Sequence, residues 1–188
     1  MTILIVYGTV EGQTRKIAEF VQEKLREAGH DVSEFDTAQR TAPVSFEGVD
    51  KVILAASVHE RRHPQTFEVF VGAHRKDLAA CETLLISVSM SAAFEEGLGE
   101  AREYLTEMEM RTEFKPDAEL LVAGAIKTGS YDYFATQVIR HVVMRDREYD
   151  ASQGEHEFTD WDALEKDVLA FSNSKTGTKL EQGGATAT

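Results

Sequence analysis

Short apolar runs separated by amphipathic stretches constrain the fold of this chain more than any other feature. Continuous apolar runs, rather than alternating ones, lie at residues 3–7, 32–35, 51–56, 83–88 and 119–125. Such runs are typical of a parallel sheet, because helices cover both faces of that sheet and bury both faces of each strand. The sequence therefore predicts a sheet of parallel strands.

Apolar residues at helical spacing lie between and after these strands. The four stripes are Ile17, Phe20, Val21 and Leu25; Phe67, Phe70, Val71, His74 and Leu78; Leu98, Ala101, Leu105 and Met108; and Trp161, Leu164, Val168 and Phe171. Thr159 or Asp160 is the expected N-cap of the last helix. Strands that alternate with helices predict a doubly wound α/β domain, and we expect a five-stranded parallel sheet in the order 2-1-3-4-5.

The composition favours one globular domain. With 188 residues, of which 42% are hydrophobic, the chain can bury one substantial core, expected to span residues 1–172. Residues 173–188 lack apolar periodicity and are expected to be a disordered tail. No run resembles a transmembrane span or secretory signal, and the single cysteine, Cys81, excludes an internal disulfide, so we expect a cytoplasmic protein. The net charge of −13 argues against nucleic-acid binding.

A turn rich in hydroxyl and small residues connects the first strand with the first helix. Its residues are Thr9, Val10, Glu11, Gly12, Gln13 and Thr14. Backbone N–H groups, threonine hydroxyls and the positive end of a helix dipole can together bind a phosphate at such a position. This phosphate turn predicts a ligand that carries a phosphate, although Thr9 or Thr14 could instead be an ordinary N-cap of the helix.

Missing residues exclude three other classes of site. A P-loop needs a lysine for the β- and γ-phosphates, and here Gln13 stands at that place in a motif that is one residue too short. A dinucleotide site needs G-x-G-x-x-G, for which Gly8 and Gly12 are wrongly spaced. A phosphoacceptor receiver domain needs an aspartate where Ser57 ends the third strand. The ligand that remains is a terminal phosphomonoester.

Two further loops follow the third and fourth strands and should meet the phosphate turn at the carboxyl edge of the sheet. Their expected ligand-binding residues are Ser57, Val58, His59, Ser87, Val88, Ser89, Met90 and Ser91. Arg61 and Arg62 in the second loop are candidates for substrate carboxylates, because guanidinium groups bind carboxylates bidentately. No metal site is expected, because His59 and His63 lack an obvious third ligand. Both loops would also suit ordinary solvent-exposed turns.

The phosphate turn, the strand order and the three loops together resemble the flavodoxin family. The resemblance implies an FMN cofactor, with Thr9 to Thr14 around its phosphate and the second and third loops beside its ring. The cofactor would carry the redox step, and no catalytic residue is assigned. The two loops contain no Tyr or Trp that could stack on the ring, and Phe94 is the nearest aromatic residue.

Other segments resemble one branch of this family, the flavodoxin-type protoporphyrinogen dehydrogenases that pass electrons to menaquinone. These segments are Ala56-Ser57-Val58, Phe67-Glu68-x-Phe70-Val71, Val122-Ala123-Gly124-Ala125 and Thr159-Asp160-Trp161. The resemblance implies that protoporphyrinogen IX is oxidised and a quinone is reduced, as a step of heme biosynthesis.

An insertion at residues 126–158 lies between the fifth strand and the last helix. Apolar residues from Phe134 to Val143 suggest an amphipathic helix in it, and its centre is locally basic. Under this resemblance the hypothetical substrate residues are Arg61, Arg62, Tyr131, Arg140 and Arg145. Residues 126–147 could contact a membrane that holds the quinone, and packing on the sheet edge is an equal alternative.

Two other functions fit the same fold. A flavodoxin-like electron carrier would use an acidic surface to dock on a basic redox partner protein. An NAD(P)H-dependent quinone reductase would need a nicotinamide site, which the sequence does not reveal. The sequence also leaves open whether the chain forms a homo-oligomer.

Overall fold

The computed structural model describes residues 1–39, 43–127 and 155–174. Its main sheet has five parallel strands in the predicted order, β2-β1-β3-β4-β5. These strands are β1 (Thr2–Gly8), β2 (Asp31–Asp36), β3 (Lys51–Ser57), β4 (Glu82–Ser89) and β5 (Ala118–Ala123). A separate antiparallel ladder joins β6 (Ala125–Lys127) to β7 (Glu155–Glu157).

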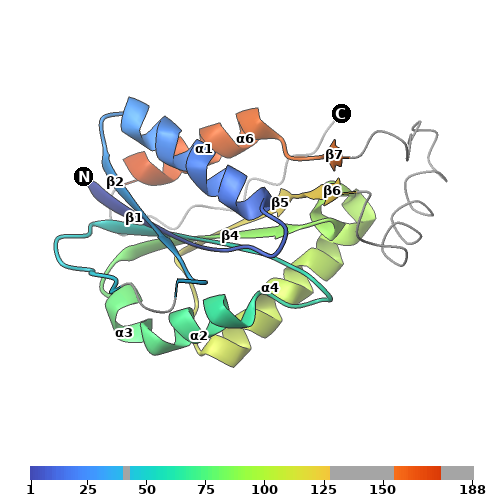
Figure 1. The fold of residues 1–188 in the computed structure, drawn as a ribbon, viewed down its shortest axis with the longest axis horizontal. Coiled ribbons are helices and arrows are strands. Elements are labelled where there is room, and N and C mark those ends of the chain that lie inside the picture. Colours follow the sequence, from blue (N-terminus) through green and yellow to red (C-terminus); the bar gives the residue numbers. More distant parts are fainter. Residues whose placement is uncertain (40–42, 128–154, 175–188) are drawn as a thin grey trace.

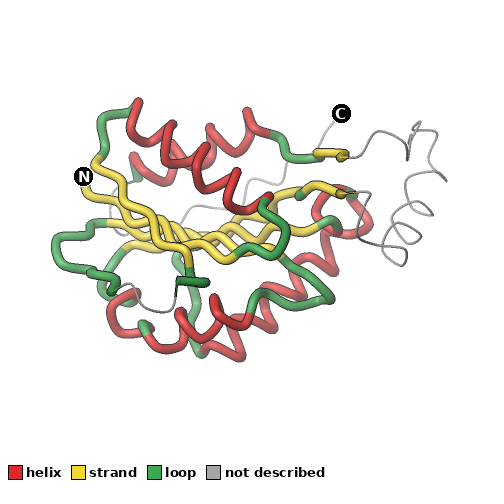
Figure 2. Tube along the Cα trace, in the orientation of Figure 1, coloured by secondary structure: helices red, strands yellow, loops and turns green. Residues whose placement is uncertain are grey.

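Helices cover both faces of the main sheet (Figure 1). They are α1 (Gln13–Glu27), α2 (Gln65–Ala73), α3 (Arg75–Leu78), α4 (Leu98–Thr112) and α6 (Trp161–Asn173). α1 and α6 lie on one face, and α2, α3 and α4 lie on the other, so the domain has three layers (Figures 1 and 2). Two short 3₁₀ turns, Ser91–Ala93 and Glu95–Gly97, lead from β4 into α4.

Successive residues of each central strand contribute to opposite cores. Ile5 of β1 belongs to the cluster with Val21 of α1 and Phe171 of α6. Its neighbour Leu4 belongs to the cluster with Phe67 of α2. Side chains alternate between the faces of a strand, so two covered faces require the continuous apolar runs seen in the sequence. Full burial of one such side chain contributes about 1.5–3 kcal/mol.

The apolar run expected as one strand at residues 119–125 is two strands, so this prediction is wrong at its end. The chain leaves the main sheet at Gly124, whose N–H donates to Ser89 O at 3.2 Å. The next residues, Ala125–Lys127, form β6 and pair with β7 instead of β4. The insertion therefore starts and ends in an antiparallel ladder, and residues 128–154 between those strands lie outside the described residues.

The stripe from Phe67 to Leu78 is also divided. α2 ends before His74, whose φ and ψ of −102° and 18° are not helical, and α3 follows it. At this break the His74 ring packs on Phe70, with ring centres 4.5 Å apart, and on Phe46 at 5.3 Å. Aromatic packing at the break therefore competes with a continuous helix.

The other boundaries agree closely with the sequence prediction. Asp160 is the N-cap of α6, and its Oδ1 accepts from the N–H of Ala163 at 3.0 Å. α6 continues to Asn173, and Ser174 Oγ donates to Glu82 Oε1 at 2.6 Å. The ordered contacts of the domain therefore reach two residues past the expected end at 172.

Lys51, at the start of β3, is a buried cation that ties the sheet to the end of α6. It is 2% exposed, and its Nζ donates to the carbonyl oxygens of Phe171 at 2.7 Å and Ser174 at 2.8 Å. Nζ also lies 3.0 Å from Glu82 Oε2. Because the last carbonyls of a helix lack intrahelical partners, the Lys51 ammonium stabilises this helix end.

We expect Lys51→Met to lower the free energy of unfolding by about 3 kcal/mol, because Glu82 would stay buried without its counter-charge. Denaturant titration followed by far-UV circular dichroism measures the change. Lys76→Met, at an exposed position of α3, is the matched control and should stay within about 0.5 kcal/mol of the parent protein. Equal stability of the two variants would contradict the role assigned to Lys51.

Candidate functional site

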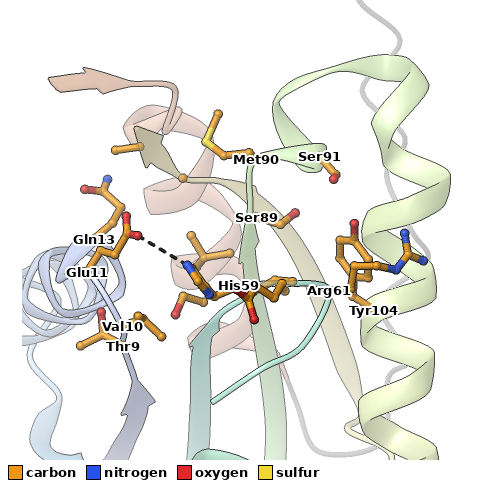
Figure 3. A pocket seen from close by; sticks show the side chains of 16 residues that line it. Thr9, Val10, Glu11, Gln13, His59, Arg61, Ser89, Met90, Ser91 and Tyr104 are labelled. Carbon is orange, nitrogen blue, oxygen red and sulfur yellow. Dashed lines mark ion pairs between the residues drawn. The ribbon is translucent and has the colours of Figure 1, made fainter. Parts of the chain in front are cut away.

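A pocket opens at the carboxyl ends of β1, β3 and β4, where the three predicted loops meet (Figure 3). Among the predicted residues, it is lined by Thr9, Val10, Glu11, Gln13, Ser57, Val58, His59, Arg61, Val88, Ser89, Met90 and Ser91. The lining also includes residues that the sequence did not reveal: Glu60, Tyr104, Gly124 and Ala125. Of the predicted residues that the structure describes, four are not part of the lining: Gly12, Thr14, Ser87 and Arg62.

The phosphate turn bends at Gly12, whose φ of 95° lies in the left-handed region that favours glycine. The Gly12 N–H donates to Thr9 Oγ1 at 2.9 Å, which closes the turn. The first intrahelical bond of α1 runs from Lys16 N to Gly12 O at 3.1 Å, so the N–H groups of residues 13–15 precede the helical ladder. The N-cap of this helix is Gly12 and no side-chain hydrogen bond caps the helix start, so the alternative that Thr9 or Thr14 is an ordinary N-cap is wrong.

Two buried hydroxyl groups at this edge of the sheet can each donate a hydrogen bond to a ligand. Thr14 Oγ1, in the first turn of α1, and Ser57 Oγ, at the end of β3, have no hydrogen-bond partner in the described part of the chain. An unsatisfied buried polar group costs about 1–3 kcal/mol, which a bound acceptor would offset. Hydroxyls beside main-chain N–H groups at a helix N-terminus suit a phosphate oxygen. The donor set therefore fits a phosphomonoester.

A tight turn in the second loop carries His59 and Arg61 to the pocket. His59 and Arg62 exchange main-chain hydrogen bonds at 2.9 and 3.0 Å, and the φ angles of Glu60 and Arg61 are 49° and 64°. Left-handed backbone at both central residues is the pattern of a type I′ turn and costs about 1 kcal/mol or more for a residue with a Cβ. Such strain concentrates at functional sites. Across the pocket, His59 Nε2 lies 3.9 Å from Glu11 Oε1 (Figure 3).

Tyr104 of α4 and Arg61 form the wall opposite the phosphate turn (Figure 3). The Arg61 guanidinium lies 5.1 Å from the centre of the Tyr104 ring, a cation–π contact, and its Nη1 donates to Glu100 Oε1 at 2.6 Å. Ser91 Oγ donates to the other Glu100 oxygen at 2.9 Å. Burial raises the pKa of Tyr104, so its hydroxyl stays protonated at neutral pH.

Tyr104 gives the pocket the aromatic ring that the second and third loops lack. Phe94, the nearest aromatic residue in the sequence, packs edge-on against Phe158 with ring centres 6.0 Å apart and does not line the pocket. The signal available in the sequence was the position of Tyr104 beside the apolar stripe of α4, next to Leu105.

Arg62 pairs with a buried carboxylate and does not line the pocket. Its Nη2 donates to Glu68 Oε2 at 2.7 Å, and Arg111 Nη2 of α4 donates to Glu68 Oε1 at 2.9 Å. Although burial acts to raise the pKa of Glu68, the two guanidinium groups lower it. The structure therefore places Arg62 in a contact between α2 and α4.

Ser87 is likewise directed to the interior. His63 Nε2 lies 2.9 Å from Ser87 Oγ, and both residues are buried. Burial lowers the pKa of His63 to about 4, although the Glu68 carboxylate acts in the opposite direction. His63 therefore does not share the pocket with His59. Within the described ranges, no group of three or more His, Cys, Asp or Glu residues could hold a metal ion.

Three hypothetical substrate residues, Tyr131, Arg140 and Arg145, lie outside the described residues, as does most of the 126–147 segment. In the part of the chain that the structure describes, no helix is long and apolar enough to cross a membrane.

We expect His63 to make the domain less stable as the pH falls from about 6.5 to 4. The unfolded state, with a histidine pKa near 6.5, binds a proton in this range that the folded state excludes, so unfolding is favoured by an amount on the order of 3 kcal/mol below pH 4. Denaturant titrations across this range should give a shallower pH dependence for His63→Gln, which can still bond Ser87. Parallel curves for the two proteins would contradict the assignment.

Comparisons with known proteins agree with this geometry. A family model described as a flavodoxin domain matches residues 4–153. Protoporphyrinogen IX dehydrogenase (quinone) of Escherichia coli (strain K12) is 25% identical over 165 residues, which cover 87% of this chain and 91% of that protein. The protein of the same name from Leishmania major is 22% identical over 172 residues, which cover 89% of this chain and 73% of that protein.

Among solved structures, oxidised Flavodoxin 1 from Bacillus cereus has the same fold. It superposes with a TM-score of 0.53 at 13% identity, and the match covers 92% of this chain and 97% of the flavodoxin. The family model matches most of the chain, from the first strand into the insertion. This chain therefore belongs to the flavodoxin family, and its cofactor is FMN.

Proposed function

We propose that this flavoprotein oxidises protoporphyrinogen IX and passes the electrons to a quinone, as a step of heme biosynthesis. The observation that carries the proposal is the extent of the pocket, which continues from the phosphate turn to a wall made by Arg61 of the second loop and Tyr104 of α4. Two proteins named protoporphyrinogen IX dehydrogenase (quinone) align with 87% and 89% of the chain, which supports the proposal. A quinone is dissolved in a membrane, so this function also requires the chain to work at a membrane surface facing the cytoplasm.

FMN, when bound, supplies a ring that accepts and releases hydrogen equivalents. The chain binds its phosphate through the N–H groups of residues 13–15 and the hydroxyls of Thr9 and Thr14. The Thr9 oxygen accepts from the Gly12 N–H, and its own proton remains to be donated. Ser57 and Ser89 of the second and third loops line the pocket, and in this proposal they lie beside the ring.

The pocket wall formed by Arg61 and Tyr104 suits a large ring that bears carboxylates. The Tyr104 ring offers an aromatic surface for an apolar macrocycle. Arg61 pairs with Glu100 through Nη1 and with Glu103 at 3.7 Å through Nη2, and its five N–H donors leave some for a propionate. Two hydrogens removed from the porphyrinogen per cycle reduce one quinone to its quinol, so the hydrogens balance. The chain positions the substrate and excludes water from the ring.

A second function, electron transfer to a partner protein, is favoured by the charge of α4. The side chains of Glu100, Glu103 and Glu107 on this helix are 42%, 69% and 50% exposed. An acidic surface beside the cofactor site would steer a basic redox protein toward it.

An anaerobic reduction experiment separates the two functions. The oxidised holoprotein is mixed with protoporphyrinogen IX, and menaquinone is then added. Because conversion of the porphyrinogen to the porphyrin removes six hydrogens and each flavin accepts two, the holoprotein is used at three or more equivalents per porphyrinogen. We expect the flavin absorbance to bleach while porphyrin fluorescence appears, and the absorbance to return with the quinone. A flavin that stays oxidised with the porphyrinogen, yet exchanges electrons rapidly with a ferredoxin-type protein, would establish the carrier instead.

The substrate wall is tested in the same assay. Arg61→Gln should raise the KM for protoporphyrinogen about tenfold and leave kcat nearly unchanged, because a charge-assisted hydrogen bond to the substrate is lost. The matched control is Arg102→Gln, an arginine of α4 that is not part of the pocket lining. Equal KM values for both variants would exclude Arg61 from substrate binding.

Thr14→Val should lower the affinity of the apoprotein for FMN and raise the stability of the apoprotein. We expect FMN to bind the apoprotein about tenfold or more weakly, because the variant loses a hydrogen bond to a charged group. The free energy of unfolding of the apoprotein should rise by about 1 kcal/mol, since the substitution removes a buried hydroxyl without a partner. Fluorescence titration with FMN and denaturant unfolding measure the two effects. Unchanged FMN affinity would show that Thr14 does not contact the phosphate.

A further inference from the structure

Glu157, the last residue of β7, joins the end of the insertion to the first turn of α1. Its Oε1 accepts from Gln13 Nε2 and from Lys16 Nζ, both at 2.8 Å. Its Oε2 accepts from Trp161 Nε1 of α6 at 3.1 Å. Burial acts to raise the pKa of Glu157, but these three donors hold it below its usual range. The carboxylate is therefore ionised and fixed between two helices.

Gln13, the partner of Glu157, is where the phosphate turn becomes a helix. The residue is 8% exposed, and its Nε2 also donates to Thr159 Oγ1 at 3.0 Å. The Thr159 hydroxyl in turn donates to the carbonyl of Ala123 at 2.7 Å. A buried amide with two fixed acceptors has a defined orientation, which in turn restricts the backbone of the residue that carries it. The first turn of α1, with its N–H groups at residues 13–15, is thus anchored from outside the turn.

The same segment also reaches the third cofactor loop. The Phe158 N–H donates to Gly124 O at 3.0 Å, and the Gly124 N–H donates to Ser89 O at 3.2 Å. Gly124 and Ser89 both line the pocket. Residues 157–159 are therefore bonded to the phosphate side of the pocket through Gln13 and to the ring side through Gly124.

We propose that Glu157 is a positioning residue for the FMN phosphate, which it controls by fixing Gln13 and the first turn of α1. Glu157 does not line the pocket, so it acts through Gln13. The end of the insertion is thereby part of the structure that supports cofactor binding. This inference rests on FMN as the cofactor and is independent of the electron donor.

The electrostatic effect of Glu157 has the opposite sign from its positioning effect. A carboxylate near a helix N-terminus competes with a phosphate for the positive end of the dipole. Lys16 pairs with Glu157 at 2.8 Å and offsets this repulsion. If charge dominated, removal of the carboxylate would strengthen FMN binding. If positioning dominates, as we propose, it weakens FMN binding, so the sign of the change decides between the two.

Titration of the apoprotein with FMN and with riboflavin, which lacks the phosphate, tests the proposal. Glu157→Ala should weaken FMN binding about tenfold and leave riboflavin binding unchanged, because the lost bond is charge-assisted and acts on the phosphate turn. Glu157→Gln keeps an oxygen for Gln13 and should retain most of the FMN affinity. Equal losses for the two flavins, tighter FMN binding, or no change with Glu157→Ala would each overturn the proposal.

Two further variants control for general destabilisation. Glu165→Ala removes another carboxylate that links α6 to α1, 3.8 Å from Lys24 Nζ and remote from the phosphate turn, and should leave FMN affinity unchanged. Gln13→Leu removes the same contact from the α1 side and is titrated in the same way, so the test stands even if Glu157→Ala fails to fold. The double variant should lose no more FMN affinity than Gln13→Leu alone, since Glu157 acts through Gln13 in this proposal. Additive losses would show that Glu157 does not act through Gln13.

Discussion

The register of the parallel strands determines where every functional group of this domain lies. Gly8 at the end of β1 is paired with Ala56 of β3, and Ala56 is paired with Ser87 of β4, so the three strands end together and their loops open at one edge. Parallel pairing also requires crossover helices, which cover both faces. The packing beneath the pocket leaves little space: a Cβ on Gly8 would lie 2.8 Å from Phe67 Cβ of α2. Close packing therefore fixes the position of the Gly8 backbone, from which the phosphate turn starts.

The parts of this structure that local patterns specify could be predicted from the sequence. The strands follow from apolar runs, and the turn after the first strand follows from a short motif. The strand order follows from the doubly wound α/β class that alternating strands and helices indicate. The end of β5 could not be predicted, because an apolar run through Gly124 has the same composition whether it pairs with β4 or with β7. Tyr104 reaches the pocket through the path of α4 across the sheet, which the sequence of the loops does not contain.

Two adjacent arginines of the second loop also differ in a way that the sequence could not predict. Arg61 and Arg62 are chemically identical, yet Arg61 lies at the pocket while Arg62 binds the buried Glu68. Their separation depends on left-handed backbone at Glu60 and Arg61, where neither residue is favoured. Buried Glu68 accepts from both Arg62 and Arg111, so the loss of Arg62 would leave this carboxylate with incomplete neutralisation. The ion pair between half-exposed Arg62 and buried Glu68 therefore helps to hold the strained turn that presents Arg61.

Charge pairing around the pocket explains how a chain of net charge −13 can bind an anionic cofactor. Basic side chains near the pocket are matched with acids, as Arg61 is with Glu100 and Lys16 with Glu157. Because these cations are already neutralised, we propose that the phosphate depends on neutral donors, namely main-chain N–H groups, threonine hydroxyls and a helix dipole equivalent to about half a charge. Salt screens such short, partly buried hydrogen bonds much less than exposed ion pairs. The missing P-loop lysine is therefore consistent with the acidic surface: the domain binds phosphate by fixed geometry, which makes the anchoring of the first turn of α1 decisive.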